Sequence, residues 1–211
     1  METLSLETRL DQGGLDASLA TLYGDVETAR SRCAKALDGF RRTFGAPAAA
    51  LFSAPGRTEL GGNHTDHQRG RVLAASVDLD ILAAAAPNHS GVIRIQSEGY
   101  PLLTVDLGRR EPLPEEENTS AALVRGVTAR MAELGCPLEK AGLDAWLTSS
   151  VPGGSGLSSS AAFEVLTGTM LNSLFWDGSR SPVELAQIGQ YAENIYFGKP
   201  CGLMDQMASS V

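Results

Sequence analysis

Residues 151–162 read Val-Pro-Gly-Gly-Ser-Gly-Leu-Ser-Ser-Ser-Ala-Ala, between an expected strand and an expected helix. Three glycines let the backbone turn sharply and approach a ligand closely. The serines open the helix, whose N-terminus presents unpaired N–H groups and a partial positive charge. The segment therefore predicts a phosphate cradle, although no lysine follows the glycines as it does in a P-loop. A strand-to-helix turn with a serine cap explains the same residues equally well.

The composition is that of a globular protein with a substantial core. Of the 211 residues, 43% are hydrophobic and 20% are charged, and the net charge is −8. An acidic chain argues against a nucleic-acid partner or an anionic membrane, since both require a basic face. A small anionic ligand stays compatible with this charge, because a single loop can bind phosphate locally.

The lack of a membrane-spanning stretch and of a secretory signal also favours the cytoplasm. The apolar stretch 81–87 is too short to span a bilayer, and residues 1–7 lack the basic region of a secretory signal. Cys33, Cys136 and Cys201 are odd in number and far apart, which is typical of reduced thiols.

The spacing of apolar residues predicts an α+β fold, because strands and helices mix without regular βαβ alternation. We expect strands over 93–98 and 102–107 to form a hairpin. The other expected elements are helices over 5–12, 15–44, 119–134, 158–176 and 182–197, and strands over 48–54, 77–86 and 141–149.

Local signals refine these elements. The second expected helix carries a stripe of apolar residues at steps of three and four, which should be buried. Pro55-Gly56 should end the first strand, and the Pro-Gly and Gly-Gly pairs of 55–62 should prevent a long regular element. Gly135 should cap the helix before it. The run 115–117 should be the exposed face of a solvated acidic loop over 109–118. The stripe consists of Leu19, Leu22, Val26, Ala29, Cys33, Leu37 and Phe40.

The segment 54–68 is rich in polar side chains between its turns. Asn63, His64 and Asp66 supply closely spaced donors and acceptors, as a polyhydroxylated ligand such as a sugar requires. A solvated turn in which Asn63 and Asp66 cap backbone groups is the alternative. A metal site at His64 and His67 is weakly supported, because no third ligand has a recognisable spacing.

Two further carboxylates stand in apolar surroundings. Glu193 falls in line with small and apolar residues of the helix 182–197, where a carboxylate needs a cation such as Mg²⁺. An ordinary surface glutamate is the alternative. Asp205 lies among Leu203, Met204 and Met207, so it is either a helix cap or a functional carboxylate with a cationic partner.

Four segments together resemble the GHMP small-molecule kinases, and within them the galactokinase family. Ala54-Pro-Gly-Arg57 followed by Gly62-x-His64-Thr65-Asp66 is similar to the galactokinase signature, and 151–161 to the phosphate loop of the superfamily. Ala192-Glu193-Asn194 and Cys-Gly-Leu-Met-Asp-Gln at 201–206 resemble two further galactokinase blocks. The order and approximate spacing of all four agree with the family.

The resemblance implies an α+β N-terminal GHMP kinase domain over 1–211, with a mixed β-sheet and packed helices. Residues 48–211 would be its motif-bearing part and residues 1–45 a helical extension. Members of the family are nearly twice as long, so it also implies that a second, C-terminal domain is missing from this chain. We therefore expect the 211 residues alone to have little or no kinase activity.

The implied reaction is transfer of the γ-phosphoryl group of ATP to the anomeric hydroxyl of galactose, giving galactose 1-phosphate and ADP. Asp205 would draw the proton from the attacking hydroxyl. Arg57 would keep Asp205 ionised and offset charge in the transition state. Ser160 and Glu193 would hold Mg²⁺ against the phosphates.

The same resemblance implies the binding residues for the two small-molecule partners. The sugar would contact Asn63, His64, Thr65, Asp66, Gly202 and Asp205. The nucleotide would contact Pro152, Gly153, Gly154, Ser155, Gly156, Leu157, Ser158, Ser159 and Ser160.

Departures from the family pattern leave the substrate open. Asn63 replaces the usual Glu, and His67 replaces the usual Tyr. Asn donates as well as accepts hydrogen bonds, so another hexose, an amino sugar or a uronic acid is the alternative substrate. Residues 120–124 lack the aromatic residue that often lies beside adenine. A non-catalytic sensor of galactose and ATP is a further alternative, although a sensor need not keep Arg57, Ser160, Glu193 and Asp205.

Overall fold

The computed structural model describes residues 5–139 and 141–211. Its centre is a five-stranded mixed sheet in the order β1-β2-β5-β3-β4, in which β3 and β5 are parallel and the other neighbours are antiparallel. This sheet and its helices confirm the predicted α+β class. The strands are β1 (Ala50–Gly61), β2 (Leu73–Pro87), β3 (Val92–Ser97), β4 (Leu103–Asp106) and β5 (Leu143–Ser149).

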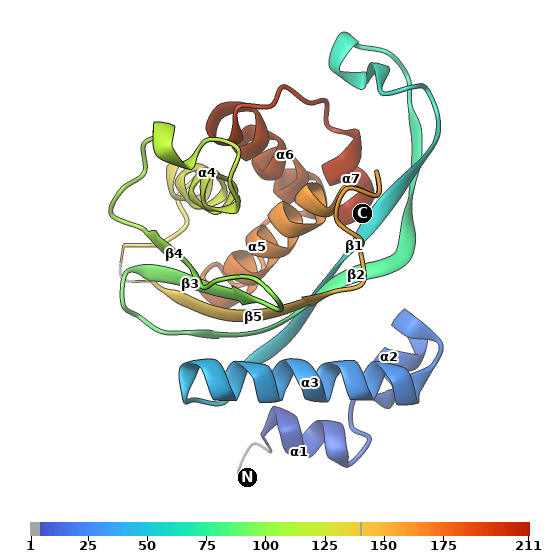
Figure 1. Cartoon of the computed structure of the whole chain (residues 1–211), viewed down its shortest axis with the longest axis vertical. Helices are drawn as coiled ribbons and strands as arrows, with labels where there is room; N and C mark the ends of the chain where they lie inside the picture. Colours follow the sequence, from blue (N-terminus) through green and yellow to red (C-terminus); the bar gives the residue numbers. More distant parts are fainter. Residues whose placement is uncertain (1–4, 140) are drawn as a thin grey trace.

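Helices cover both faces of the sheet, so the fold has three layers (Figure 1). On one face lie α4 (Ser120–Glu133), α5 (Ser159–Phe175), α6 (Pro182–Ala192) and α7 (Met204–Ser210). On the other face lies α3 (Val26–Phe44), and α1 (Leu6–Asp11) and α2 (Asp16–Tyr23) pack against α3.

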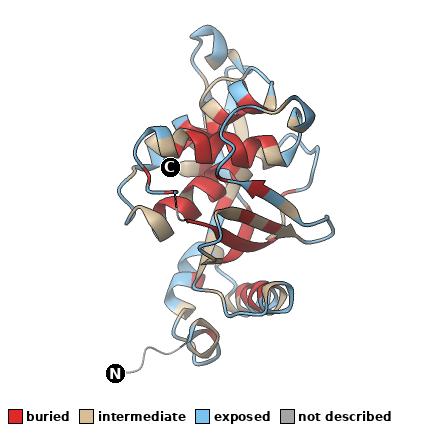
Figure 2. Ribbon diagram, turned by 90° about the vertical axis from the view of Figure 1, so that its left-hand side faces the viewer, coloured by how far each residue is buried: buried red, intermediate tan, exposed pale blue. Residues whose placement is uncertain are grey.

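Strand alternation divides the interior into two cores. Ile81, Ala83 and Ala85 of β2 face the core shared with α4, α5 and α6. Leu82 and Ala84 of the same strand face the core shared with α3. Buried residues therefore occur on both sides of the sheet (Figure 2). The N-terminal helices close its second face, and the division into a helical extension and a motif-bearing part stays a prediction.

The predicted helix over 15–44 is wrong in one respect, because it is two helices. Gly24 has φ +71°, which a helix does not tolerate, and the side chain of Asp25 caps α3 by accepting from the N–H groups of Glu27 and Thr28. The break changes which face of α2 packs into the core shared with α3. Leu22, predicted to be buried, is 62% exposed, whereas Leu19 is buried.

The prediction that Pro55-Gly56 ends the first strand is also wrong. β1 continues to Gly61, which pairs with Leu73, the first residue of β2. β2 therefore begins before its predicted start at residue 77. Irregularities in the pairing between Pro55 and Arg57 and between Glu59 and Gly61 accommodate the turn-forming residues. The strand therefore carries the chain directly into the polar segment.

Other boundaries agree closely with the sequence pattern. The predicted hairpin is β3 and β4. Leu134 rather than Gly135 is the C-terminal cap of α4, and Gly135 follows it with φ +98°. The last turn of the helix predicted over 182–197 is π-helical, at Glu193–Phe197.

One acidic residue of the 109–118 loop differs from the prediction. Glu116 is not simply on an exposed face, because it accepts two hydrogen bonds from the buried Arg125, at 2.7 Å from Nε and 2.6 Å from Nη2. A buried guanidinium requires such a partner.

In the described part of the chain, no helix combines the length and the apolar character needed to cross a bilayer. The three cysteines are free thiols.

Gly39 gives a test of the packing between α3 and the sheet. A Cβ at this position would lie 2.4 Å from the Trp146 ring of β5. Gly39→Ala should therefore lower the free energy of unfolding by about 1–3 kcal/mol, although Gly-to-Ala normally stabilises a helix interior. Chemical denaturation measures this change, and Ser31→Ala on the exposed side of α3 is the control, expected to shift it by less than about 0.5 kcal/mol. A stabilised Gly39→Ala protein contradicts the close contact.

Candidate active site

A bidentate ion pair joins β1 to α7 across 148 residues of sequence. Arg57 donates from Nε to Oδ1 of Asp205 at 2.8 Å and from Nη2 to Oδ2 at 2.9 Å. Its third nitrogen, Nη1, donates to the carbonyl of Gly156 at 2.6 Å. Arg57 is only 5% exposed. One buried guanidinium thus binds the strand, the glycine loop and the helix together, and Asp205 has the cationic partner that its sequence surroundings suggested.

The environment of Asp205 keeps its carboxyl group ionised. Burial alone would raise the pKa of Asp205, but hydrogen bonds from Arg57 and Ser158 and the charge of Arg57 hold it below the ordinary value. An ionised carboxylate can accept a proton from a bound hydroxyl group.

Ser158 is not the serine cap that the alternative interpretation of the loop requires. It lies directly before α5 with φ +53°, and its side chain makes no capping hydrogen bond. Its hydroxyl donates to Oδ2 of Asp205 instead. The loop also lies against β1, because the N–H of Arg57 donates to the carbonyl of Leu157 at 3.0 Å. A Cβ on Gly56 would lie 2.8 Å from that same carbonyl oxygen.

A polar cavity of about 500 Å³ opens beside this ion pair. It gathers most of the predicted site residues from three distant motifs. Four predicted site residues do not line it, namely Asn63, Thr65, Gly153 and Glu193. His67, considered above only as a weakly supported metal ligand, does line it, and so does Lys199, for which the sequence predicts no role. The predicted site residues that line the cavity are Arg57, His64, Asp66, Pro152, 154–160, Gly202 and Asp205.

Asp66 connects the polar turn after β1 to the start of α7. Its Oδ2 accepts from the N–H of Met204 at 2.9 Å, so it caps a backbone group far away in the sequence. A Cβ on Gly202 would lie 1.8 Å from the same oxygen, so only glycine leaves room for Asp66 there. That Asn63 caps a backbone group stays a prediction. Its backbone lies in the left-handed region, and its side chain is exposed.

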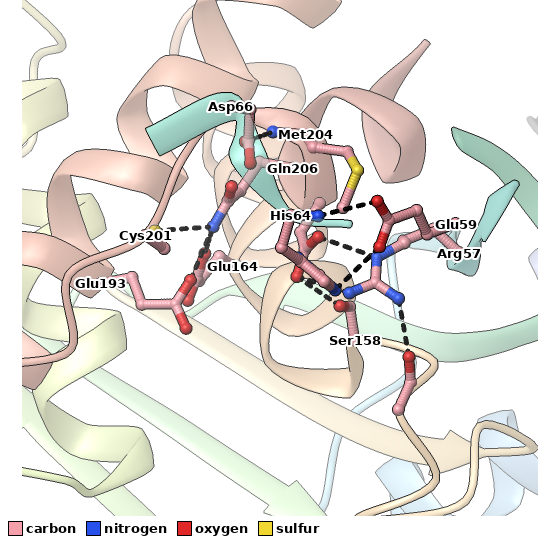
Figure 3. Close-up of polar contacts among 12 residues, drawn as sticks. Arg57, Glu59, His64, Asp66, Ser158, Glu164, Glu193, Cys201, Met204 and Gln206 are labelled. Atoms are coloured by element: carbon pink, nitrogen blue, oxygen red, sulfur yellow. Dashed lines mark hydrogen bonds and ion pairs between the residues drawn. The ribbon is translucent and has the colours of Figure 1, made fainter. Parts of the chain in front are cut away.

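Sequence reasoning missed Glu59, which holds His64. Oε1 of Glu59 accepts from the His64 N–H at 2.8 Å, and Oε2 lies 3.2 Å from His64 Nε2 (Figure 3). His64 has φ +53°, an uncommon conformation that such contacts stabilise. Glu59 stands five residues before His64, and only the extension of β1 places the two side by side.

Glu193 belongs to a buried polar cluster rather than to the surface. It is 2% exposed, so the alternative of an ordinary surface glutamate is wrong. Gln206 donates from Nε2 to Glu193 at 2.8 Å and to Glu164 at 3.0 Å (Figure 3). Burial and the neighbouring Glu193 raise the pKa of Glu164 well above its ordinary value. Sequence reasoning missed Glu164 and Gln206, although Glu164 is an isolated acid on the apolar helix α5.

A second cavity of about 540 Å³ shares Ser159 and Ser160 with the first and also contains Gly153. Its walls are largely apolar. Residues 120–124 of the α4 region contribute no aromatic side chain, but three aromatic residues from other segments line this cavity. They are Tyr100, Phe163 and Phe197. The two cavities meet where α5 begins.

Two family models match this chain. The galactokinase galactose-binding signature matches residues 38–87, and the GHMP kinases N terminal domain matches residues 122–211. Galactokinases of Lacticaseibacillus casei and Streptomyces coelicolor are each 37% identical over 171 residues, 81% of this chain. The chain is similar to the N-terminal part of galactokinases. It spans 44% and 43% of the length of these two galactokinases.

Solved structures agree with this similarity. The chain matches Lactococcus lactis galactokinase complexed with galactose at a TM-score of 0.74 and 29% identity, over 83% of this chain and 45% of that one. Mevalonate kinase of Methanococcus jannaschii matches at a TM-score of 0.65 and 17% identity, over 76% of this chain and 50% of that chain, which shows the shared fold. The chain thus has the N-terminal fold of a galactokinase.

The Arg57–Asp205 ion pair should control the pKa of Asp205, and this can be tested by removing the guanidinium. Without the guanidinium, Arg57→Met leaves Asp205 partly buried without its ion-pair partner, so the pKa of Asp205 should rise above its ordinary value. A carboxyl ¹³C NMR titration measures the shift. Arg94→Met, which breaks the distant pair with Asp144, is the control and should leave Asp205 unchanged. An unaltered Asp205 titration in Arg57→Met would contradict the electrostatic role of this pair.

Proposed function

We propose that the protein phosphorylates galactose at its anomeric hydroxyl with ATP and releases galactose 1-phosphate and ADP. The observation that carries this proposal is the Arg57–Asp205 ion pair, which joins Arg57 of the galactose-binding signature to α7 and to the glycine loop. Phosphoryl transfer depends mainly on positioning and on charge stabilisation, and a preorganised ion pair between two binding regions serves both.

Asp205 would accept the proton of the attacking hydroxyl group, and Arg57 would stabilise charge on the transferred phosphoryl group. The lowered pKa of Asp205 supports the first role, because a carboxylate must be ionised to take a proton. The position of Arg57 supports the second, since its guanidinium contacts both Asp205 and the glycine loop.

The nucleotide would lie across the junction of the two cavities. Residues 152–160 would hold the phosphates with backbone N–H groups at the start of α5. The base would occupy the apolar cavity, where Tyr100, Phe163 and Phe197 offer aromatic surface.

The sugar would occupy the polar cavity. His64, Asp66 and Gly202 line it beside Asp205, and this supports their predicted contacts with sugar hydroxyl groups. Asn63 and Thr65 stay predictions as sugar contacts, because both lie in the same turn but outside the cavity lining. The cytoplasmic location likewise stays a prediction.

The donor chemistry of Ser160 and Glu193 fits Mg²⁺. A hydroxyl and a carboxylate oxygen are the hard ligands that this ion takes, usually with phosphate oxygens and water completing its coordination. Ser160 lines the cavity, and Glu193 already holds a cation, the ammonium of Lys199 at 3.2 Å. When bound, Mg²⁺ would neutralise phosphate charge, while Ser160 and Glu193 would hold it.

Asp205→Asn tests the proposal directly. Loss of the carboxylate removes the proton acceptor, so turnover should fall by at least about 100-fold. A coupled assay of ADP release with galactose measures turnover on the full-length protein, and calorimetry measures sugar binding, which should be retained. Arg94→Met serves as the distant control, with turnover unchanged. A protein that binds both ligands but never turns over, even in the unmodified form, would instead be a sensor.

Asn63 supports a second candidate, a related sugar kinase with a different hexose, amino sugar or uronic acid. A panel of these sugars with ATP distinguishes the two substrates. If galactose is the substrate, Asn63→Glu should lower the KM for galactose by adding a hydrogen-bond acceptor. Asn63→Gln is the matched control without the charge. Higher turnover with another sugar in the unmodified protein would favour the second candidate.

A further inference from the structure

Lys199 lies at the same cavity as the glycine loop, which has no lysine of its own. It follows the π-helical turn, and its side chain is 60% exposed and lines the cavity with residues 152 and 154–160. Its Nζ lies 3.2 Å from Oε1 of Glu193, which is almost completely buried. The ammonium group thus stands between a buried carboxylate and the open cavity.

Other basic side chains of this cavity are already engaged by the protein. All three nitrogens of Arg57 donate to Asp205 or to Gly156. The His64 ring lies against Glu59, and Nδ1 of His67 lies 2.6 Å from the His64 carbonyl. An ammonium group has three donors, and in the described contacts Lys199 directs one of them at Glu193.

We propose that Lys199 binds the phosphates of the nucleotide, and so supplies from a distant segment the ammonium that the glycine loop lacks. This inference rests on the proposed function. The flexible four-carbon stem lets Nζ turn from Glu193 towards the loop without movement of the backbone. Because Glu193 is also the expected metal-binding carboxylate, a metal cation in place of Lys199 would leave no uncompensated buried charge.

The ammonium group of a lysine is charged at neutral pH. The alternative is that Lys199 only neutralises Glu193. In that case its loss would lower stability but leave the discrimination between phosphorylated and unphosphorylated ligands intact.

Calorimetric titration of the full chain with adenosine, ADP and ATP, with and without Mg²⁺, separates these roles. Lys199→Met should weaken ATP and ADP binding by roughly ten- to hundredfold, the usual effect of a lost hydrogen bond to a charged group. Adenosine affinity should stay unchanged, and Lys199→Arg should restore most of the ATP affinity. Arg42→Met removes an exposed charge of α3, far from the cavity, and should change none of the three.

Unchanged ATP affinity in Lys199→Met, or an equal loss for adenosine and ATP, would overturn the proposal. If Lys199→Met does not fold, Glu193→Gln with Lys199→Met keeps the cluster neutral. It should bind ATP at least tenfold more weakly than Glu193→Gln alone, and equal affinities would again overturn the proposal. An unmodified chain that binds no nucleotide contradicts the proposed function as well, whereas ATP binding that ignores Lys199 contradicts only this inference.

Discussion

The candidate site depends on the ion pair between Arg57 and Asp205. A charged pair removed from water is stable only if its geometry is good and its remaining donors are satisfied, and both conditions hold here. The guanidinium uses all three nitrogens, on the carboxylate and on the Gly156 carbonyl. The strand, the glycine loop and the last helix must therefore be placed together. Loss of either partner leaves the other charge partly buried without compensation.

That arrangement in turn requires a sheet that is rigid at β1. The side chains of β2 alternate between two cores, and helices cover both faces of the sheet. The N-terminal helices thus contribute to the site indirectly, because they bury the face opposite the cavities. Asp80 of β2 reinforces this attachment, since Tyr23, Arg32 and Ser53 all donate to its carboxylate. A strand held on both faces can present Arg57 in a fixed position.

The sequence pattern predicted the elements and the motifs better than the contacts between them. Apolar spacing located nearly every helix and strand, and the four motifs predicted most of the residues that line the polar cavity. Local rules failed at Pro55-Gly56, because pairing with β2 and two irregularities outweigh the turn preference there. Glu59 and Gln206 were missed for a related reason. Their importance comes from partners that only the folded chain brings close.

The distribution of charge explains how an acidic protein can offer an anion site. The chain carries a net charge of −8, so attraction of a phosphate must be local. Backbone N–H groups at the start of α5 would supply part of this attraction, and they need no basic side chain. The buried cluster of Glu164, Glu193 and Gln206 would supply the rest indirectly, because the Glu193 carboxylate holds the Lys199 ammonium beside the cavity. Glu193, which would hold a metal cation, would thus also keep the Lys199 ammonium beside the phosphate-binding region until the nucleotide binds.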